Sequence, residues 1–327
     1  MKFESISKYL YSAAILVTVG IVYQKYQDKH NTDSDEYQYE MIRKYLLNDP
    51  PLGKMKKPVL WIHIPYEINS RKWDDFGSRN SKNLNEPYMY LTIKSIIEHC
   101  SNSFNICLID DSTFSKLIPD WNIDLNYVED PIKPNLRKLA FMKLLYIYGG
   151  FIVPPSFICS KNLKSLYNEG TYENTKPFTC EIVSRNSTSS LVDFFPSNEM
   201  MGSPKQNSVI KEYITYIEKL LSKDATSESV FDGNMDRWLY MNVKNQNINL
   251  ISGAKIGTKT IDNKPIVLEE LFNKNINFEL SHNNYGIYLS NKELLSRHKF
   301  GWFVNISIDE ILVSEIFIAK LLQKCVD

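Results

Sequence analysis

Two adjacent carboxylates, Asp110 and Asp111, directly follow the apolar run Phe104–Ile109, which we expect to form a buried strand. Ligands of open α/β sheets gather at the carboxyl ends of strands, so both residues are candidate ligand contacts. A second interpretation stays open for Asp111, because acidic residues also cap helices. An amphipathic helix, capped at Ser112 or Thr113, is predicted to follow.

The predicted fold is arranged around one stretch, LRKLAFMKLLYIYGGFIVPPSF, Leu136–Phe157. Its apolar residues cover a broad helical face, the pair Gly149 and Gly150 permits a turn, and Phe151–Val153 forms a short strand. Two prolines then end the strand, because neither can donate a backbone hydrogen bond to a neighbouring strand. We therefore expect a helix, a tight corner and a strand in immediate succession.

This stretch resembles the Asp-x-Asp-containing sugar transferases of the capsular-polysaccharide and mannosyltransferase type, which have the GT-A nucleotide-sugar fold. The segment LLYIYGG, Leu144–Gly150, matches the LYxYGG helix end of that family. The resemblance implies that the next strand ends in Asp-x-Asp, which holds Mn²⁺ or Mg²⁺ against the donor diphosphate. In this chain the three positions are Pro154, Pro155 and Ser156, and an Asp and an Arg of the family's helix fall on Lys138 and Phe141.

The missing carboxylates change the expected chemistry. Mn²⁺ and Mg²⁺ require hard oxygen ligands, which two prolines and a serine do not supply, so we predict no metal site. The first hypothesis is a degenerate domain that binds a nucleotide, a nucleotide sugar, a glycan or a partner without transferring sugar. A purely structural, membrane-tethered scaffold without a ligand is a further hypothesis. The alternative is an active, metal-independent transferase in which Arg137 and Lys138 neutralise the leaving diphosphate, with Ser156 as a further nucleotide-sugar contact.

The resemblance implies two more contacts near the start of the domain. The segment PVLWIHIP, Pro58–Pro65, is predicted to be a central strand and is similar to the strand with which the family contacts the nucleotide. His63 is therefore a candidate nucleotide contact, although a buried, hydrogen-bonded histidine explains it equally well. The strand that ends at Asp110 and Asp111 is similar to the family's second strand, so these residues are candidate ribose or acceptor contacts.

The C-terminal half contains the remaining site candidates. Asp232 and Asp236 lie in the polar stretch Ala225–Asn249, where the family has an acceptor-side segment, so either could act as a base; a solvated loop is the other interpretation. The segment Ser296–Val304 resembles the family's closing His…Trp element. It implies a catalytic His298 and a sugar-nucleotide contact at Trp302, but His298 alone is a weak set of metal ligands. In an active enzyme Asp111 or Asp236 would be the base and His298 would help to stabilise the diphosphate.

Composition limits the classes of partner. The chain of 327 residues is 43% hydrophobic, which suffices for a large α/β domain with a buried core. Its 38 basic residues equal its 38 acidic residues, so nothing favours a nucleic acid as partner. The five cysteines show no CxxC spacing, which argues against zinc and against a disulfide framework.

An uncharged stretch, Tyr9–Tyr23, is predicted to be an uncleaved signal anchor that spans the membrane once, with a buried core helix as the alternative. We divide the chain into an anchor, a polar stalk and a transferase-like domain, residues 1–26, 27–57 and 58–327. The expected location is an endomembrane of the Golgi type or, because the whole chain is similar to transferase-like proteins of large DNA viruses, a virion or host membrane. Two sequons, at Asn186 and Asn305, are compatible with luminal exposure.

The remaining pattern predicts a mixed α/β sheet with helices on both faces. The resemblance implies that this sheet has the GT-A-like arrangement. Apolar spacing predicts helices at Tyr88–His99 and Ile308–Leu322, and core positions on a helix that includes Ile210–Leu221. The segment Leu250–Phe272 is predicted to form a hairpin, with its turn at Asp262, followed by a helix.

Overall fold

The computed structural model describes residues 57–64, 86–183, 193–223, 228–274 and 280–326. The predicted membrane anchor and stalk, the sequon at Asn186 and most of the polar loop after the first strand lie outside these residues. Among the helices within the described ranges, none combines the length and the apolar character that crossing a bilayer requires.

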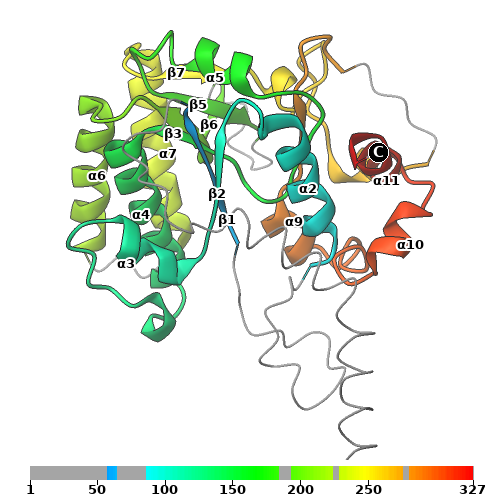
Figure 1. The fold of residues 1–327 in the computed structure, drawn as a ribbon, viewed down its shortest axis with the longest axis horizontal. Coiled ribbons are helices and arrows are strands. Elements are labelled where there is room, and N and C mark those ends of the chain that lie inside the picture. Colours follow the sequence, from blue (N-terminus) through cyan, green and yellow to red (C-terminus); the bar gives the residue numbers. More distant parts are fainter. Residues whose placement is uncertain (1–56, 65–85, 184–192, 224–227, 275–279, 327) are drawn as a thin grey trace, which may run out of the picture. The chain divides into compact units, whose positions relative to one another are not determined.

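A six-stranded mixed sheet forms the centre of the described domain (Figure 1). β1 pairs in parallel with β2 and with β3, and β5 pairs in parallel with β7, whereas β6 is antiparallel to both β3 and β5. Five strands of this sheet therefore point the same way, and we call the edge at which they end the carboxyl edge. In spatial order the strands are β2 (Asn105–Ile109), β1 (Val59–His63), β3 (Gly150–Ile152), β6 (Phe195–Ser203), β5 (Phe178–Ile182) and β7 (Asn249–Ile251).

Helices flank the sheet, so the predicted mixed α/β class is confirmed. Figure 1 shows α4, α6 and α7 on one side and α2, α9 and α11 on the other. Their apolar residues fill the core, including the fully buried Trp61, Tyr213 and Phe151. The longer helices are α2 (Tyr88–Cys100), α4 (Ile132–Tyr148), α6 (Ser208–Leu221), α7 (Glu228–Lys244) and α11 (Phe317–Val326).

Shorter elements complete the domain. A second sheet of two antiparallel strands joins β4 (Phe157–Cys159) to β8 (Gly286–Tyr288). All five cysteines are buried thiols. The short helices are α3 (Phe114–Leu117), α5 (Lys164–Gly170), α8 (Leu268–Leu271), α9 (Asn291–Ser296) and α10 (Ile308–Leu312).

The predicted helix, corner and strand are present as α4, the two glycines and β3. Gly149 and Gly150 have φ values of 69° and 104°, a region that residues with a Cβ atom rarely adopt. A Cβ atom on Gly150 would lie 2.2 Å from the carbonyl oxygen of Val59, so β3 approaches β1 too closely for any other residue. The indole of Trp61 donates to the carbonyl of Gly149 at 2.9 Å and fixes the corner against β1.

Three predictions about the C-terminal half were wrong. The stretch expected as a solvated loop is largely the helix α7, because Met235 and Leu239, one turn apart, are fully buried. The predicted hairpin is only a turn with one isolated bridge, Lys259 to Pro265. The single helix expected over Ile308–Leu322 is two helices, α10 and α11, because Ser307 caps a helix that already ends at Leu312.

Candidate functional site

Three of the predicted site residues, His63, Asp111 and Arg137, meet at the carboxyl edge. The β1–β2 register pairs His63 with Ile109, so the residues that follow β2 lie beside the imidazole. Asp111 accepts a hydrogen bond from Nε of Arg137 at 2.8 Å and from a terminal guanidinium nitrogen at 2.7 Å. His63 Nε2 lies 2.9 Å from the same carboxylate. We call these three residues the edge triad.

The edge triad is an ion-pair network that is largely shielded from solvent. The side chains of Arg137 and Asp111 are 15% and 18% exposed. The His63 ring stacks on Phe114 at 5.7 Å and meets the edge of Phe141 at 5.6 Å. Burial would raise the pKa of Asp111, but hydrogen bonds from His63 and Arg137 hold that pKa well below its usual range. The carboxylate is therefore ionised and fully engaged, which argues against its predicted role as a base.

Asp110 has a local structural role. Its carboxylate accepts from the backbone N–H of Thr113 at 2.9 Å and from the hydroxyls of Ser112 and Thr113, which forms a capping box. The predicted caps were therefore wrong: neither Ser112 nor Thr113 caps this turn, and Asp111 does not cap it either. Asp110 satisfies the backbone N–H of Thr113 in the turn that follows β2, and Asp111 is available to Arg137.

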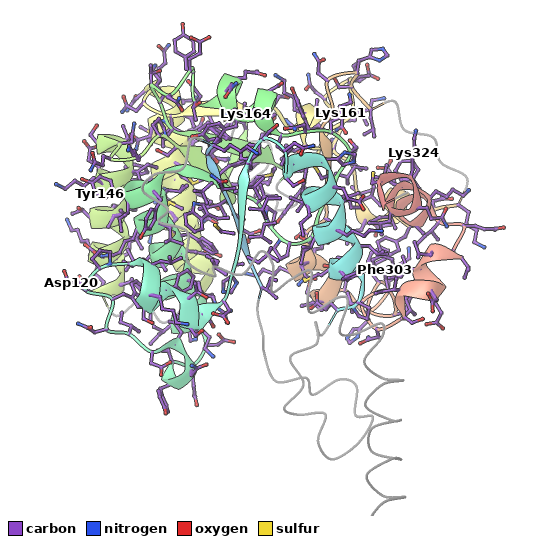
Figure 2. The ribbon with its side chains drawn as sticks, in the orientation of Figure 1. Asp120, Tyr146, Lys161, Lys164, Phe303 and Lys324 are labelled. Carbon is purple, nitrogen blue, oxygen red and sulfur yellow. The ribbon has the colours of Figure 1, made fainter. Side chains whose placement is uncertain are left out.

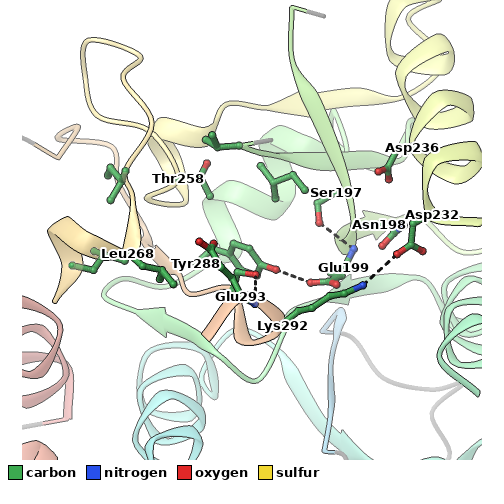
Figure 3. Close-up of a pocket in the computed structure, with 15 residues that line it drawn as sticks. Ser197, Asn198, Glu199, Asp232, Asp236, Thr258, Leu268, Tyr288, Lys292 and Glu293 are labelled. Carbon is green, nitrogen blue, oxygen red and sulfur yellow. Dashed lines mark hydrogen bonds and ion pairs between the residues drawn. The ribbon is translucent and has the colours of Figure 1, made fainter. Parts of the chain in front are cut away.

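A cavity of about 220 Å³ is lined by residues from both sheets and from α7, α8 and α9 (Figure 3). The end of β5 and the beginning of β6 form part of its wall, because β6 enters the sheet at the edge where β5 leaves it. We call this cavity the acidic pocket. Its charged and hydroxyl-bearing residues are Ser197, Glu199, Asp232, Asp236, Thr258, Tyr288, Ser290, Lys292 and Glu293.

Ion pairs and hydrogen bonds position two of these carboxylates. Lys138, on α4, forms an ion pair with Asp232 on α7, and Lys292 lies 3.8 Å from the other oxygen of the same carboxylate. The hydroxyl of Tyr288 donates to Glu199 at 2.6 Å. Lys138 therefore joins the helix of the edge triad to the wall of the acidic pocket.

Asp236 differs from its neighbours. It has no hydrogen bond or ion pair with another residue in the described part of the chain, although it lies one helical turn from Asp232. Burial, and then the negative charges of Asp232 and Glu199, raise the pKa of Asp236 to about 7, against the opposing effect of Lys138. Near neutral pH this carboxyl group can exchange a proton with a bound ligand.

The segment at the family's metal position does not fit a metal. Pro154 is buried and its carbonyl accepts from the N–H of Phe157 at 3.0 Å, while the carbonyl of Pro155 accepts from the Thr92 hydroxyl at 2.5 Å. Ser156 is only 3% exposed, and none of the three residues lines the acidic pocket. Within the described ranges no group of three or more His, Cys, Asp or Glu residues could hold a metal ion.

The structure does not bring His298 and Trp302 to the other candidates. Both are exposed, and neither lines the acidic pocket. Trp302 is 45% exposed and makes edge-to-face contacts with Phe272 and Phe303, each at 5.9 Å. Arg297, which precedes His298, forms ion pairs with Glu269 and with Glu293, and of these two glutamates Glu293 lines the pocket.

Sequence reasoning missed Glu199, Tyr288, Lys292 and Glu293. They belong to three separate elements, and no spacing in the sequence connects them. The i, i+4 spacing of Asp232 and Asp236 places two carboxylates on one face of a helix. This signal could be used only after the segment was known to be helical, as it is in α7. No protein-family profile matches the chain, and a comparison with characterised proteins finds none of significant similarity.

Proposed function

We propose that this protein is a glycosyltransferase-like binding protein, which takes up a sugar ligand at the carboxyl edge, as a nucleotide sugar or a glycan, without metal-dependent transfer. The proposal rests on one observation: the segment Pro154–Ser156, at the family's metal position, packs against α2 and offers no carboxylate. Ligands of such sheets bind where the strands end, and the acidic pocket opens at that edge. The GT-A-like fold, the membrane attachment through the predicted anchor and the viral resemblance belong to the same proposal.

The charges near the edge also favour binding over transfer. Departure of a nucleoside diphosphate requires positive charge on the phosphates, supplied by a metal or by basic side chains. The two candidates for that role are already paired, Arg137 with Asp111 and Lys138 with Asp232. A diphosphate would have to displace these carboxylates before it could use either cation.

A second candidate function is metal-independent glycosyl transfer, and the position of Asp236 favours it. A general base is most effective when its pKa lies near the working pH, and the pKa of Asp236 is about 7. In this reaction Asp236 would accept the proton of an acceptor hydroxyl as that oxygen bonds to the anomeric carbon and the nucleoside diphosphate leaves. Lys138, released from Asp232, would then face the diphosphate.

The test is a binding and turnover measurement on the full-length protein in mild detergent. Calorimetry and thermal shift are recorded with UDP, GDP, their sugar conjugates and free monosaccharides, with and without Mn²⁺. We expect binding that Mn²⁺ does not change, and no release of sugar from the nucleotide. Turnover that is lost in Asp236→Asn would establish the second function instead, and the absence of binding by every nucleotide and sugar would contradict both.

A further inference from the structure

We propose that the acidic pocket binds a small hydroxylated ligand that carries a protonated amine, the chemistry of an amino sugar, in preference to a neutral sugar or a phosphate. The inference rests on the proposed sugar-binding function and names the class of ligand that the pocket selects. It follows from the size of the pocket, the balance of charge on its wall and the arrangement of its polar and apolar residues.

Size restricts the ligand to a single small unit. Sites for drug-sized molecules usually enclose roughly 300–1,000 Å³. The acidic pocket encloses about 220 Å³, which is too little for a complete nucleotide sugar. The pocket is therefore suited to one sugar ring, whether this is a free sugar, the terminal unit of a glycan or the sugar of a larger donor.

The charge on the wall favours a cation. Four of the residues that line the pocket are acidic, and one, Lys292, is basic. The side chain of Lys292 is 67% exposed and lies 3.8 Å from Asp232, so it reaches the pocket from its solvent side. Lys138 and Arg297, which do not line the pocket, pair with Asp232 and Glu293. The remaining negative charge is that of Glu199 and Asp236, which an ammonium group would reduce and a phosphate would increase.

Asp236 is the residue that an ammonium group would satisfy. Lys138 and Lys292 both pair with Asp232, and Glu199 accepts from Tyr288, but Asp236 has no such partner among the described residues. A desolvated carboxylate without a partner is unfavourable, and a charge-assisted hydrogen bond from an amine removes this cost. Figure 3 shows Asp232, Asp236 and Glu199 on the same side of the pocket.

The rest of the lining suits a sugar ring. Thr258 and Ser290 carry hydroxyls, and the amide of Asn198 can both donate and accept. Ile266, Leu268 and Leu271 form an apolar portion of the wall that can cover the C–H face of a ring. The Thr258 hydroxyl donates to the Glu181 carbonyl and the Ser290 hydroxyl accepts from the Glu293 N–H, so each offers a ligand its remaining hydrogen-bonding capacity. A simple alkyl amine would use the carboxylates alone.

The experiment compares matched ligands on the full-length protein. Calorimetry or saturation-transfer NMR is recorded at pH 7 and low salt with glucosamine, glucose and N-acetylglucosamine. The three share the ring and differ in the group at one position, where only glucosamine is charged. We expect glucosamine to bind at least about tenfold more tightly than the two uncharged sugars, which corresponds to one charge-assisted contact. Equal affinities for the three would overturn the inference.

Two substitutions assign the effect to the pocket. Asp236→Asn should reduce the preference for glucosamine to within about twofold, since it removes the charge and keeps the shape. Asp120→Asn is the matched control: Asp120 is an exposed residue on the outer surface (Figure 2), with φ 60°, a conformation that asparagine tolerates, and it should retain the full preference. If Asp236→Asn kept the preference, or if Asp120→Asn lost it, the amine would bind elsewhere and the inference would be wrong. Circular dichroism confirms that both variants are folded.

Failure of this inference can be distinguished from failure of the proposed function. If nucleotide sugars and neutral sugars bind but the amine brings no advantage, the proposed function stands and the inference is overturned. Butylamine serves as a second probe. If butylamine binds in an Asp236-dependent manner while no sugar or nucleotide binds, the pocket binds cations. The amino-sugar ligand is then wrong, and so is the proposed sugar-binding function.

Discussion

The guanidinium of Arg137 holds Asp111 in a two-pronged ion pair, with nitrogen-to-oxygen distances of 2.8 and 2.7 Å. This pair connects the second turn of α4 to the residue that follows β2, at the edge where ligands of such sheets bind. Because both side chains are largely shielded, loss of either partner removes a charge-assisted contact at a place where little water can replace it.

We expect Arg137→Met and Asp111→Asn each to lower the free energy of unfolding by about 3–5 kcal/mol. The double variant should lose markedly less than the sum, because both single variants remove the same ion pair. Urea denaturation of the four proteins measures this coupling. The control is the exposed pair Lys274 and Glu315, 3.3 Å apart, where Lys274→Met should change stability by about 0.5 kcal/mol or less. Additive losses at Arg137 and Asp111 would show that the pair has no energetic coupling.

Carboxylates restored at the family's metal position should not restore a metal site. Pro154 and Ser156 are buried, so Pro154→Asp with Ser156→Asp places two carboxylates away from water. We expect a loss of about 3 kcal/mol or more in the free energy of unfolding, which Mn²⁺ does not recover. The alanine pair at the same positions controls for the loss of proline and serine. A Mn²⁺-dependent rise in melting temperature in the aspartate pair alone would show that the segment can face a ligand after all.

The raised pKa of Asp236 predicts the direction of one pH effect. In the unfolded chain an aspartate has its ordinary pKa of 3.8, whereas in the folded protein the pKa of Asp236 is about 7. The folded state therefore holds the proton more tightly, and the stabilisation from this group is complete below pH 4 and is lost as the pH rises through 7. Relative to Asp236→Asn, the wild-type protein should lose up to about 4 kcal/mol between pH 4 and pH 8.

Unfolding by urea at several pH values measures that difference. Asp120→Asn, at an exposed position, should show the same pH profile as the wild-type protein. A constant difference between wild type and Asp236→Asn across this range would mean that the carboxyl group has an ordinary pKa in the folded protein.

Two glycines should respond in opposite ways to the same substitution. Gly150→Ala places a Cβ atom 2.2 Å from the Val59 carbonyl at φ 104°, so we expect severe destabilisation, seen as loss of soluble, folded protein. At Gly233, inside α7, an added Cβ atom would meet nothing within 4 Å, so Gly233→Ala should stabilise the protein by about 0.5–1 kcal/mol. Thermal melts measure the stability of both variants. A well-folded Gly150→Ala protein would contradict the close approach of β3 to β1.

Local patterns were sufficient to predict the elements at the centre of the fold. The broad apolar face of α4, the two glycines and the short apolar run of β3 each determine their structure within a few residues. The same applies to β1 and β2, whose carboxyl ends place His63 beside Asp111. The sequence therefore indicated one side of the site correctly.

The acidic pocket could not be predicted in the same way, because its residues are brought together by tertiary contacts. Glu199 comes from the reversed strand β6, and Tyr288 from β8, which pairs with β4 in the second sheet. The one local clue, two acids at helical spacing, was obscured by the polar composition of α7, whose apolar face is narrow. The partners of Arg137 and Lys138 were likewise hidden, since each lies in a distant part of the chain.

Arg137 and Lys138 are consecutive residues of α4, so their side chains leave the helix axis roughly 100° apart. Arg137 forms an ion pair with Asp111, which lies after β2, and Lys138 forms an ion pair with Asp232 on α7. The two ion pairs therefore connect one helix, α4, to two separate parts of the fold. A ligand that draws Asp232 away from Lys138 would therefore remove the link between α4 and α7 while leaving the link between α4 and Asp111 in place, and the core packing of α4 would decide how much of that change is felt elsewhere.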